Sequence, residues 1–337
     1  MNNTTNVISA SLLIAPYQLN IFFGSFLWIM GNFGCIGNML VYRSRAFRKQ
    51  SYAIYLFSAA VADCHYFNFV LLTRILQNGF RIPVMNRYLV ICKLRQFSTF
   101  WGNIVSFSLF SFAIIDRLLS VQRSNTYRQW SNRVSVAYKM IILIPLFWLL
   151  LIGHRLILYR IKNGTCGPPD GFYNDYDNYF QVIFSSHSST VVMAILAYLL
   201  IKSVRDIANR RVVPMNSISP NISQKNSMLK DMDAQLTKML VTESIIAVIT
   251  YFPYAVQLTY SNITQTWYKT PLQIAWENVF IELIHLLNYV FFATSFYVSL
   301  ISNVGFRRKI KQLLKINKHI QSDGQTITFR RDATMIQ

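Results

Sequence analysis

The sequence predicts an all-α membrane protein, a bundle of seven transmembrane helices followed by a short amphipathic helix on the membrane surface. Charged residues make up only 14% of the 337 residues, against ~25% in ordinary soluble domains. Apolar residues make up 53% and gather in long stretches, with short basic segments between them. A soluble fold of this size cannot bury so much apolar surface, whereas helices that face lipid need not bury it.

Each apolar stretch is long enough to cross the hydrocarbon core, which requires about 20 residues in a helix. Helices are expected because an open sheet cannot satisfy its backbone hydrogen bonds in lipid. The predicted spans are, in order, Leu19–Tyr42, Tyr52–Leu76, Tyr88–Val121, Val136–Tyr159, Tyr179–Val204, Leu236–Asn262 and Leu272–Val304.

The bundle is therefore expected over residues 19–304, with polar segments at both ends. Residues 1–18 contain no basic residue and predict an extracellular tail without a cleavable signal peptide. Residues 305–316 place apolar side chains on one helical face among basic ones, which is typical of a helix on the anionic inner leaflet. Residues 317–337 are expected to form a cytoplasmic tail.

The longest polar stretch, Arg205–Gln235, contains two prolines and many Ser and Asn residues. It predicts a flexible inner loop, whose last residues can continue the sixth helix.

The distribution of the 33 basic residues predicts the orientation. Most of them fall in the segments that lie on one side if the amino terminus is outside, and an excess of Lys and Arg marks the cytosolic side. We therefore expect a multi-pass plasma-membrane protein with an extracellular amino terminus and a cytoplasmic carboxyl terminus. Four N-glycosylation acceptors fall on the segments expected outside: Asn2, Asn3, Asn163 and Asn262.

Three other classes of protein fit the sequence less well. A nucleic-acid binder would cluster its basic residues on one polar surface, whereas here they lie in short runs between spans. An enzyme would need grouped His, Cys or acidic residues, and the five His residues are scattered. A transporter or channel would need a polar path and paired broken helices, and no half of the sequence repeats the other.

Polar residues inside the spans are candidates for function because they are costly in hydrocarbon. Asn38 and Asp63 lie deep in the first and second spans, as a buried polar pair or as a cation site that changes occupancy. Asp116 and Arg117 lie at the inner end of the third span, as a membrane-boundary anchor or as part of a latch. In the latch, Asp233 near the sixth helix is an alternative partner for Arg117.

Two further features concern the geometry of the bundle. Pro253 interrupts the hydrogen bonding of the sixth helix, which lipid merely tolerates or which provides a hinge. Cys92 and Cys166 both face the oxidising outer side, so a disulfide is expected between them. Cys35 and Cys64 lie within spans and are interpreted as packing residues.

Together these positions resemble the rhodopsin-like family of G-protein-coupled receptors over roughly Leu19 to Leu314. The resemblance rests on one ordered set of motifs: Gly37-Asn38, Ala62-Asp63, Cys92, Ser106, Asp116-Arg117-Leu118, Trp148, Tyr198 and Pro253. It implies no catalytic residue and a heterotrimeric G protein as partner. It also implies a polar core of Asn38, Asp63, Ser106 and Ser295 that can hold Na⁺, and an activation switch that includes Tyr198, Pro253 and Tyr297.

The chain also departs from the family pattern. Leu118 replaces the motif tyrosine, Tyr251 stands in place of the usual tryptophan, and Thr190 replaces the fifth-helix proline. The seventh-helix Asn-Pro-x-x-Tyr motif reads Ser295-Phe296-Tyr297-Val298-Ser299. The resemblance therefore indicates a divergent member.

The expected signal is a neuropeptide or another amphipathic extracellular ligand, with a chemosensory role as the alternative. No lysine for retinal occurs between Leu272 and Phe306, and Thr99 occupies the place of the aspartate that amine receptors use. Two sets of charged residues are candidates for opposite ligand charges: Arg95, Arg155 and Arg160 for an acidic terminus, and Glu277, Glu282, Asp170, Asp175 and Asp177 for a basic ligand. The other candidate ligand contacts lie in the outer half of the bundle: Thr99, Asn103, His187, Tyr251, Tyr254, Gln257, Glu282, His285 and Tyr289.

The predicted orientation can be tested with epitope tags at Met1 and Gln337. Antibody should reach the Met1 tag on intact cells and the Gln337 tag only after permeabilisation, because an odd number of spans separates the two ends. Labelling of both tags on the same face would contradict the seven-span topology.

Overall fold

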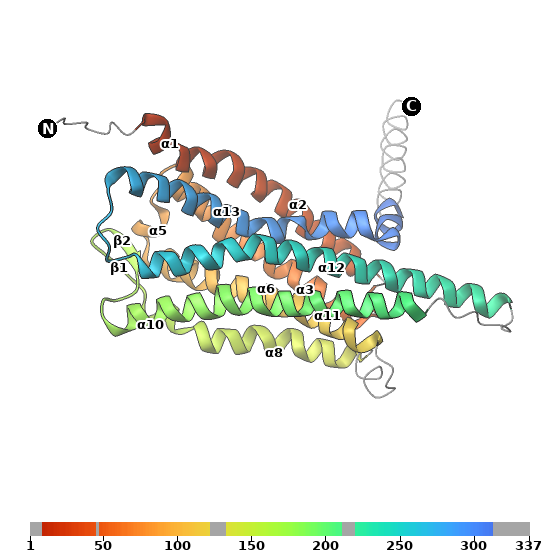
Figure 1. Cartoon of the computed structure of the whole chain (residues 1–337). Helices are drawn as coiled ribbons and strands as arrows, with labels where there is room; N and C mark the ends of the chain where they lie inside the picture. Colours follow the sequence, from red (N-terminus) through yellow and green to blue (C-terminus); the bar gives the residue numbers. More distant parts are fainter. Residues whose placement is uncertain (1–8, 45–46, 122–132, 211–219, 313–337) are drawn as a thin grey trace, which may run out of the picture.

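The computed structural model describes residues 9–44, 47–121, 133–210 and 220–312, which form an almost entirely helical bundle (Figure 1). Seven of the described helices are long and apolar enough to cross a membrane. They confirm the predicted all-α bundle, and their bounds are Ala10–Tyr42, Ser51–Gly79, Leu89–Ser120, Val134–Ile152, Phe172–Ser203, Ala234–Ile263 and Pro271–Ser302.

The first, second and fifth spans contain wide, π-helical turns (η). The first span runs through α1 (Ala10–Leu19), η1 (Asn20–Gly24) and α2 (Ser25–Tyr42). The second runs through α3 (Ser51–His65), η2 (Tyr66–Leu71), α4 (Leu72–Arg74) and η3 (Ile75–Gly79). Turns of this kind are rare and often occur at functional sites.

The remaining elements follow in chain order. A short helix α5 (Val84–Arg87) precedes the third span α6 (Leu89–Val121), and the fourth span is α8 (Val134–Ile152) followed by α9 (His154–Leu158). The antiparallel strands β1 (Arg160–Lys162) and β2 (Thr165–Gly167) pair Ile161 with Cys166. The last three spans are α10–η4–α11 (Phe172–Phe180, Gln181–His187, Ser188–Arg210), α12 (Pro220–Ile263) and α13 (Pro271–Ser302).

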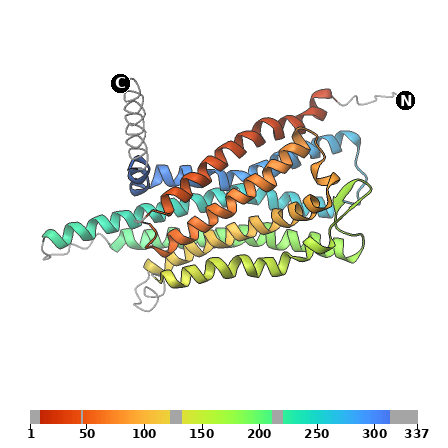
Figure 2. The same ribbon diagram turned by 180° about the vertical axis from the view of Figure 1, so that it is seen from behind.

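The two ends of the bundle differ. The β1–β2 hairpin and the start of α1 lie at one end, and the first residues of α12 and the end of α13 lie at the other (Figures 1 and 2). Residues 304–312 are helical, and Phe306 in this stretch is fully buried against Tyr42 and Phe296.

Large apolar side chains lie on the outside of the bundle as well as inside it. Phe22, Leu150 and Ile157 are each more than 70% exposed, an arrangement that costs free energy in water and none in lipid. Aromatic side chains pack against one another in the interior: the ring centroid of Phe107 lies 4.3 Å from that of Tyr251 and 4.9 Å from that of Phe291.

Helix boundaries differ from the predictions at four places, one of which is the fifth span, which begins at Phe172 rather than Tyr179. The helix of the first span begins at Ala10, so residues 10–18, predicted as tail, extend it. The α-helix of the fourth span ends at Ile152 rather than Tyr159, and after Gly153 the short helix α9 continues to Leu158. The segment predicted as an inner loop is helical up to Arg210 and again from Pro220. The second helix begins at Pro220 because proline suits the first position of a helix.

Gly31 allows the first and second spans to approach closely. An ideal Cβ at Gly31 would overlap the ring of Phe67, which is fully buried. Gly37 stands in the same relation to the ring of Phe296 on α13. The absence of side chains at these positions therefore determines how closely α2 packs on its neighbours.

Gly31→Ala should lower the free energy of unfolding by about 1–3 kcal/mol, because the buried ring has to leave its packed position. Gly167→Ala is the matched control, since nothing lies within 4 Å of a Cβ there. Thermal unfolding of the purified proteins in the same detergent measures the difference. Equal midpoints for the two variants would contradict the close packing.

Candidate functional site

Glu282 on α13 is the centre of a polar cluster in the outer half of the bundle. Its carboxylate accepts hydrogen bonds from Arg74 at 2.6 Å, from Asn20 at 2.8 Å and from Asn78 at 2.8 Å. The Arg74 and Glu282 side chains are only 10% and 15% exposed. We call Asn20, Arg74, Asn78, Glu282 and His285 the outer cluster; it joins the first, second and seventh spans.

His285 continues the outer cluster one turn further along α13. Its Nδ1 lies 3.2 Å from the Arg74 guanidinium and must accept this hydrogen bond, because arginine can only donate. Its ring also meets Tyr254 edge-on at 5.2 Å, and Tyr289 stacks on Tyr66 at 5.1 Å. Three residues predicted as ligand contacts, Glu282, His285 and Tyr289, thus already have partners on other helices.

Arg74 has no role among the residues predicted from the sequence. The sequence does contain an indication of its importance, because Arg74 is a charged residue within the predicted second span. Only the fold shows that its partner is Glu282, since the two residues are 208 positions apart.

A second contact joins the third, fifth and sixth spans. The Tyr251 hydroxyl donates to Asn103 Oδ1 at 3.0 Å, and the Asn103 amide donates to Ser185 Oγ at 3.1 Å. All three residues are buried, and Tyr251 precedes Pro253 by two positions in α12. This contact holds the sixth helix against the third at the level of the proline.

Three other predicted ligand contacts, Thr99, His187 and Gln257, lie in different surroundings. The Thr99 hydroxyl donates to the Arg95 carbonyl oxygen of its own helix at 2.7 Å. His187 is exposed, and its Nδ1 lies 3.1 Å from the Val182 carbonyl oxygen of its own helix. Gln257 is buried, and its Oε1 has no hydrogen-bond partner within the described residues.

The four residues of the predicted polar core surround one small cavity in the middle of the bundle. Ser106 donates to the Asp63 carboxylate, and the Asn38 amide donates to Ser295 Oγ at 3.3 Å. The cavity volume is about 10 Å³, close to the space that one water molecule needs. Its lining includes a carboxylate, two hydroxyls and an amide oxygen, a set of hard oxygen donors that fits Na⁺.

Glu243 on α12 is a second buried carboxylate near this core, and from the sequence it is only an acid within a span, with no predicted role. It is 1% exposed, and its Oε1 accepts a hydrogen bond of 3.4 Å from Ser299. The Ser299 hydroxyl in turn lies 3.3 Å from the Tyr42 hydroxyl. Through Tyr42, Glu243 and Ser299, the first, sixth and seventh spans are therefore also joined near the cavity.

At the inner end of α6, Asp116 accepts a 2.7 Å hydrogen bond from Ser51. The Arg117 guanidinium lies 5.1 Å from the centre of the Tyr52 ring, and the residue is only 8% exposed. Both residues thus pack against the start of α3. The side chain of Asp233, the predicted alternative partner, lies outside the part of the chain whose side chains the structure describes.

Three predicted switch residues lie in different surroundings. Tyr198 is 64% exposed, so it does not point into the bundle. The Tyr297 hydroxyl donates to the Met30 carbonyl oxygen at 3.2 Å and therefore faces the first span. Pro253 lies within α12, which continues through it to Ile263.

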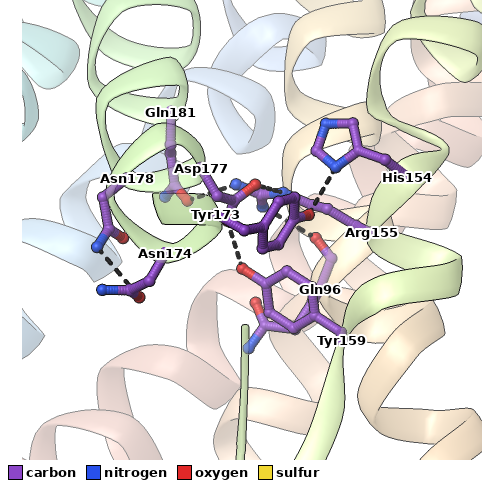
Figure 3. A network of polar contacts seen from close by, with 9 residues as sticks. All are labelled: Gln96, His154, Arg155, Tyr159, Tyr173, Asn174, Asp177, Asn178 and Gln181. Carbon is purple, nitrogen blue, oxygen red and sulfur yellow. Dashed lines mark hydrogen bonds and ion pairs between the residues drawn. The ribbon is translucent and has the colours of Figure 1, made fainter. Parts of the chain in front are cut away.

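A buried network covers the outer ends of the third, fourth and fifth spans (Figure 3). Arg155 donates to Asp177 at 2.8 Å, with both side chains 1% exposed. Tyr159 donates to the second oxygen of Asp177 at 2.6 Å, and Arg155 also donates to Gln181 at 3.1 Å. Arg155, a candidate for an acidic ligand terminus, is therefore already neutralised.

The predicted disulfide between Cys92 and Cys166 is present and attaches β2 to the start of α6. The Cys166 amide also donates to Asn86 at 3.1 Å. At the exposed side of the hairpin, Lys162 pairs with Asp170 and holds the pKa of that carboxyl below its usual value.

The glycosylation acceptors remain predictions. Asn163 lies at the exposed turn between β1 and β2 with a φ of 52°, and the Asn262 amide donates to the Leu258 carbonyl oxygen of α12 at 3.0 Å. Asn2 and Asn3 lie outside the described residues.

Asp177→Asn should lower the free energy of unfolding by about 3–5 kcal/mol, because it leaves the buried Arg155 without a counter-charge. Asp170→Asn removes one partner of an exposed pair and should change the unfolding temperature little. Thermal unfolding in detergent checks both variants. An Asp177→Asn variant as stable as Asp170→Asn would contradict a stabilising role for the buried Arg155–Asp177 pair.

Comparison with known proteins adds no family to this description. No protein-family model matches the chain, and no curated protein matches it at a significant level.

Proposed function

We propose that this chain is a receptor that binds an extracellular ligand and activates a heterotrimeric G protein. The observation that carries the proposal is the series of buried polar contacts at three levels of the bundle: the outer cluster, the polar core around Asp63, and the contacts of Asp116 and Arg117 at the inner end. Polar groups are retained in hydrocarbon chiefly where they serve a function. The resemblance to rhodopsin-like receptors supports the same assignment.

The size of the central cavity supports a receptor rather than a transporter or channel. Leu56, Phe110, Phe291 and Phe292 line it together with the polar core, and its ~10 Å³ holds about one water. A transport path would need a continuous series of polar groups. The polar contacts at the three levels instead link helices to one another, as a switch between two packings requires.

The proposed mechanism is a shift between two populations of the bundle. A ligand that binds better to one arrangement of the outer helices stabilises that arrangement. The sixth helix then moves outward about Pro253, and the Tyr251–Asn103 hydrogen bond, which holds it to the third helix, is broken or repositioned. The movement opens an inner crevice beside Arg117 for the G protein.

The proposed surroundings follow from the same topology. The amino terminus lies outside the cell, the basic inner segments face the cytosol, and residues 304–312 lie on the inner leaflet. Na⁺ bound by Asp63 and its neighbours would stabilise the arrangement in which the cavity is intact. A peptide signal is favoured, with a chemosensory ligand as the alternative within the same fold.

Nucleotide exchange on purified G proteins tests the function. The receptor in lipid nanodiscs is exposed to peptide and odorant libraries, and binding of GTP analogue to each class of Gα subunit is followed. Ligand-dependent acceleration of exchange is expected. Ion flux through reconstituted vesicles, together with no exchange in response to any ligand that binds, would favour a transporter or channel instead.

Arg117→Ala should abolish the acceleration of nucleotide exchange and leave ligand affinity within about threefold, or ~0.7 kcal/mol, because Arg117 lies at the inner end. Lys139→Ala is the matched control: Lys139 is basic and exposed near the start of α8. Exchange by the Arg117→Ala receptor at the rate of the Lys139→Ala receptor would remove Arg117 from this role.

A further inference from the structure

The outer end of the bundle contains a cleft. Of the residues predicted for ligand binding, Glu282 alone belongs to its lining. Its walls come from α1, from η3 and the segment that follows it, and from the outer turns of α13, and its volume is about 520 Å³. Sites for small ligands fall mostly between about 300 and 1,000 Å³. We call it the α1–α13 cleft. Figures 1 and 2 both show α1 and the start of α13 side by side at this end.

The charges of the cleft differ in whether they are already paired. Glu282 and Arg81 are its two charged lining residues. The Glu282 carboxylate accepts three hydrogen bonds and is paired with Arg74, so it has little affinity left for a cation. Arg81 is exposed, and its guanidinium stacks 3.8 Å from the centre of the Tyr17 ring. Within the described residues no carboxylate pairs with it.

The uncharged lining residues have two kinds of chemistry. Gln77, Asn78, Asn86 and Asn278 present side-chain amides, which both donate and accept hydrogen bonds. Leu12, Leu13 and Pro16 of α1 form an apolar wall opposite. A ligand that satisfies both sides has hydrogen-bonding groups along one edge and an apolar group on the other.

We propose that the α1–α13 cleft binds the carboxylate end of an amphipathic extracellular ligand, with Arg81 as its counter-ion. The carboxylate pairs with the Arg81 guanidinium, which binds planar oxyanions through two parallel hydrogen bonds. The adjacent apolar group lies against the α1 wall, and the amides bind the polar edge. A peptide with a free carboxyl terminus has this chemistry, and so has a small organic acid.

The backbone supports a dedicated position for Arg81. Its φ is 57°, in the left-handed region that non-glycine residues seldom adopt. The Ile82 amide that follows donates to the Leu76 carbonyl oxygen at 2.9 Å, which closes the chain reversal after η3. This turn and the Tyr17 ring hold the guanidinium at the edge of the cleft.

Occupancy of the cleft has a direct route to the outer cluster. Glu282 lines the cleft, and its carboxylate also accepts hydrogen bonds from Arg74 and Asn20. Asn78 likewise lines the cleft and donates to Glu282. A ligand between α1 and α13 therefore bears on the contact that joins the first, second and seventh spans. This step deepens the proposed receptor function and rests on it.

Affinity selection tests the site with defined libraries as probes. Purified receptor in nanodiscs is incubated with a library of short peptides that have free carboxyl termini, with the same library amidated, and with a panel of aliphatic and aromatic carboxylic acids. Bound compounds are identified by mass spectrometry. Recovery of free-carboxyl peptides or acids, with the amidated library left behind, is expected, and the arm that is recovered identifies the source of the carboxylate.

Four variants locate the binding. Arg81→Asn keeps a residue that tolerates the left-handed backbone and should weaken the recovered compounds about tenfold or more, or ~1.4 kcal/mol. Arg81→Lys should restore part of the affinity. Asn278→Trp fills the cleft and should abolish binding. Arg87→Asn is the matched control, because Arg87 is an exposed arginine over a tyrosine ring, 5.7 Å from Tyr88, and does not line the cleft.

Equal recovery of the carboxylate and amidated libraries, recovery of neither, or equal affinity for Arg81→Asn and Arg87→Asn would overturn the proposal. The receptor function fails separately. Arg81-dependent binding with no nucleotide exchange would leave the site standing without the function. Exchange driven by a ligand whose affinity ignores Arg81 would leave the function without this site.

Discussion

Hydrocarbon offers no water to a buried polar group, and this constraint organises the interior of the bundle. Each helix satisfies its own backbone, and while a hydroxyl such as that of Thr99 can donate to a carbonyl of its own helix, the buried carboxylates find partners on other helices. Glu282 does so with three donors from two other spans. Asp63 does so with Ser106, and Glu243 with Ser299. The polar residues thus determine which helices are joined. Aromatic rings fill the space between the helices, and glycines allow the helices to approach closely.

The Arg74–Glu282 pair connects most of what we propose about function. An isolated charge at either position would be costly in lipid, so the two residues stabilise the bundle only as a pair. Glu282 also borders the α1–α13 cleft, and His285 links Arg74 to Tyr254 on the sixth span. Three contacts, from Glu282 to Arg74, to His285 and to Tyr254, therefore lead from the cleft to the helix that is proposed to move.

The outer and inner ends of the bundle use different means of attachment. Outside, the Cys92–Cys166 disulfide, the β1–β2 hairpin and the buried Arg155–Asp177 pair fix the third, fourth and fifth spans together. At the inner end, the contacts among the described residues include the hydrogen bond from Ser51 to Asp116 and the packing of Arg117 against the Tyr52 ring.

The sequence by itself determined the seven spans, because a run of about 20 apolar residues is a local property that lipid requires. It also located the cysteine pair, Asn38 and Asp63, since polar and cysteine residues stand out within apolar runs, whereas Ser106 and Ser295 were implied only by the resemblance to rhodopsin-like receptors. Its errors were local as well: α1 begins earlier than predicted, and the α-helix of the fourth span ends sooner, at Ile152. Tertiary structure alone decided the partners. Arg74 meets Glu282 and Tyr297 faces Met30 across more than 200 positions of chain, and the orientation of a side chain around its helix depends on packing that no local pattern records.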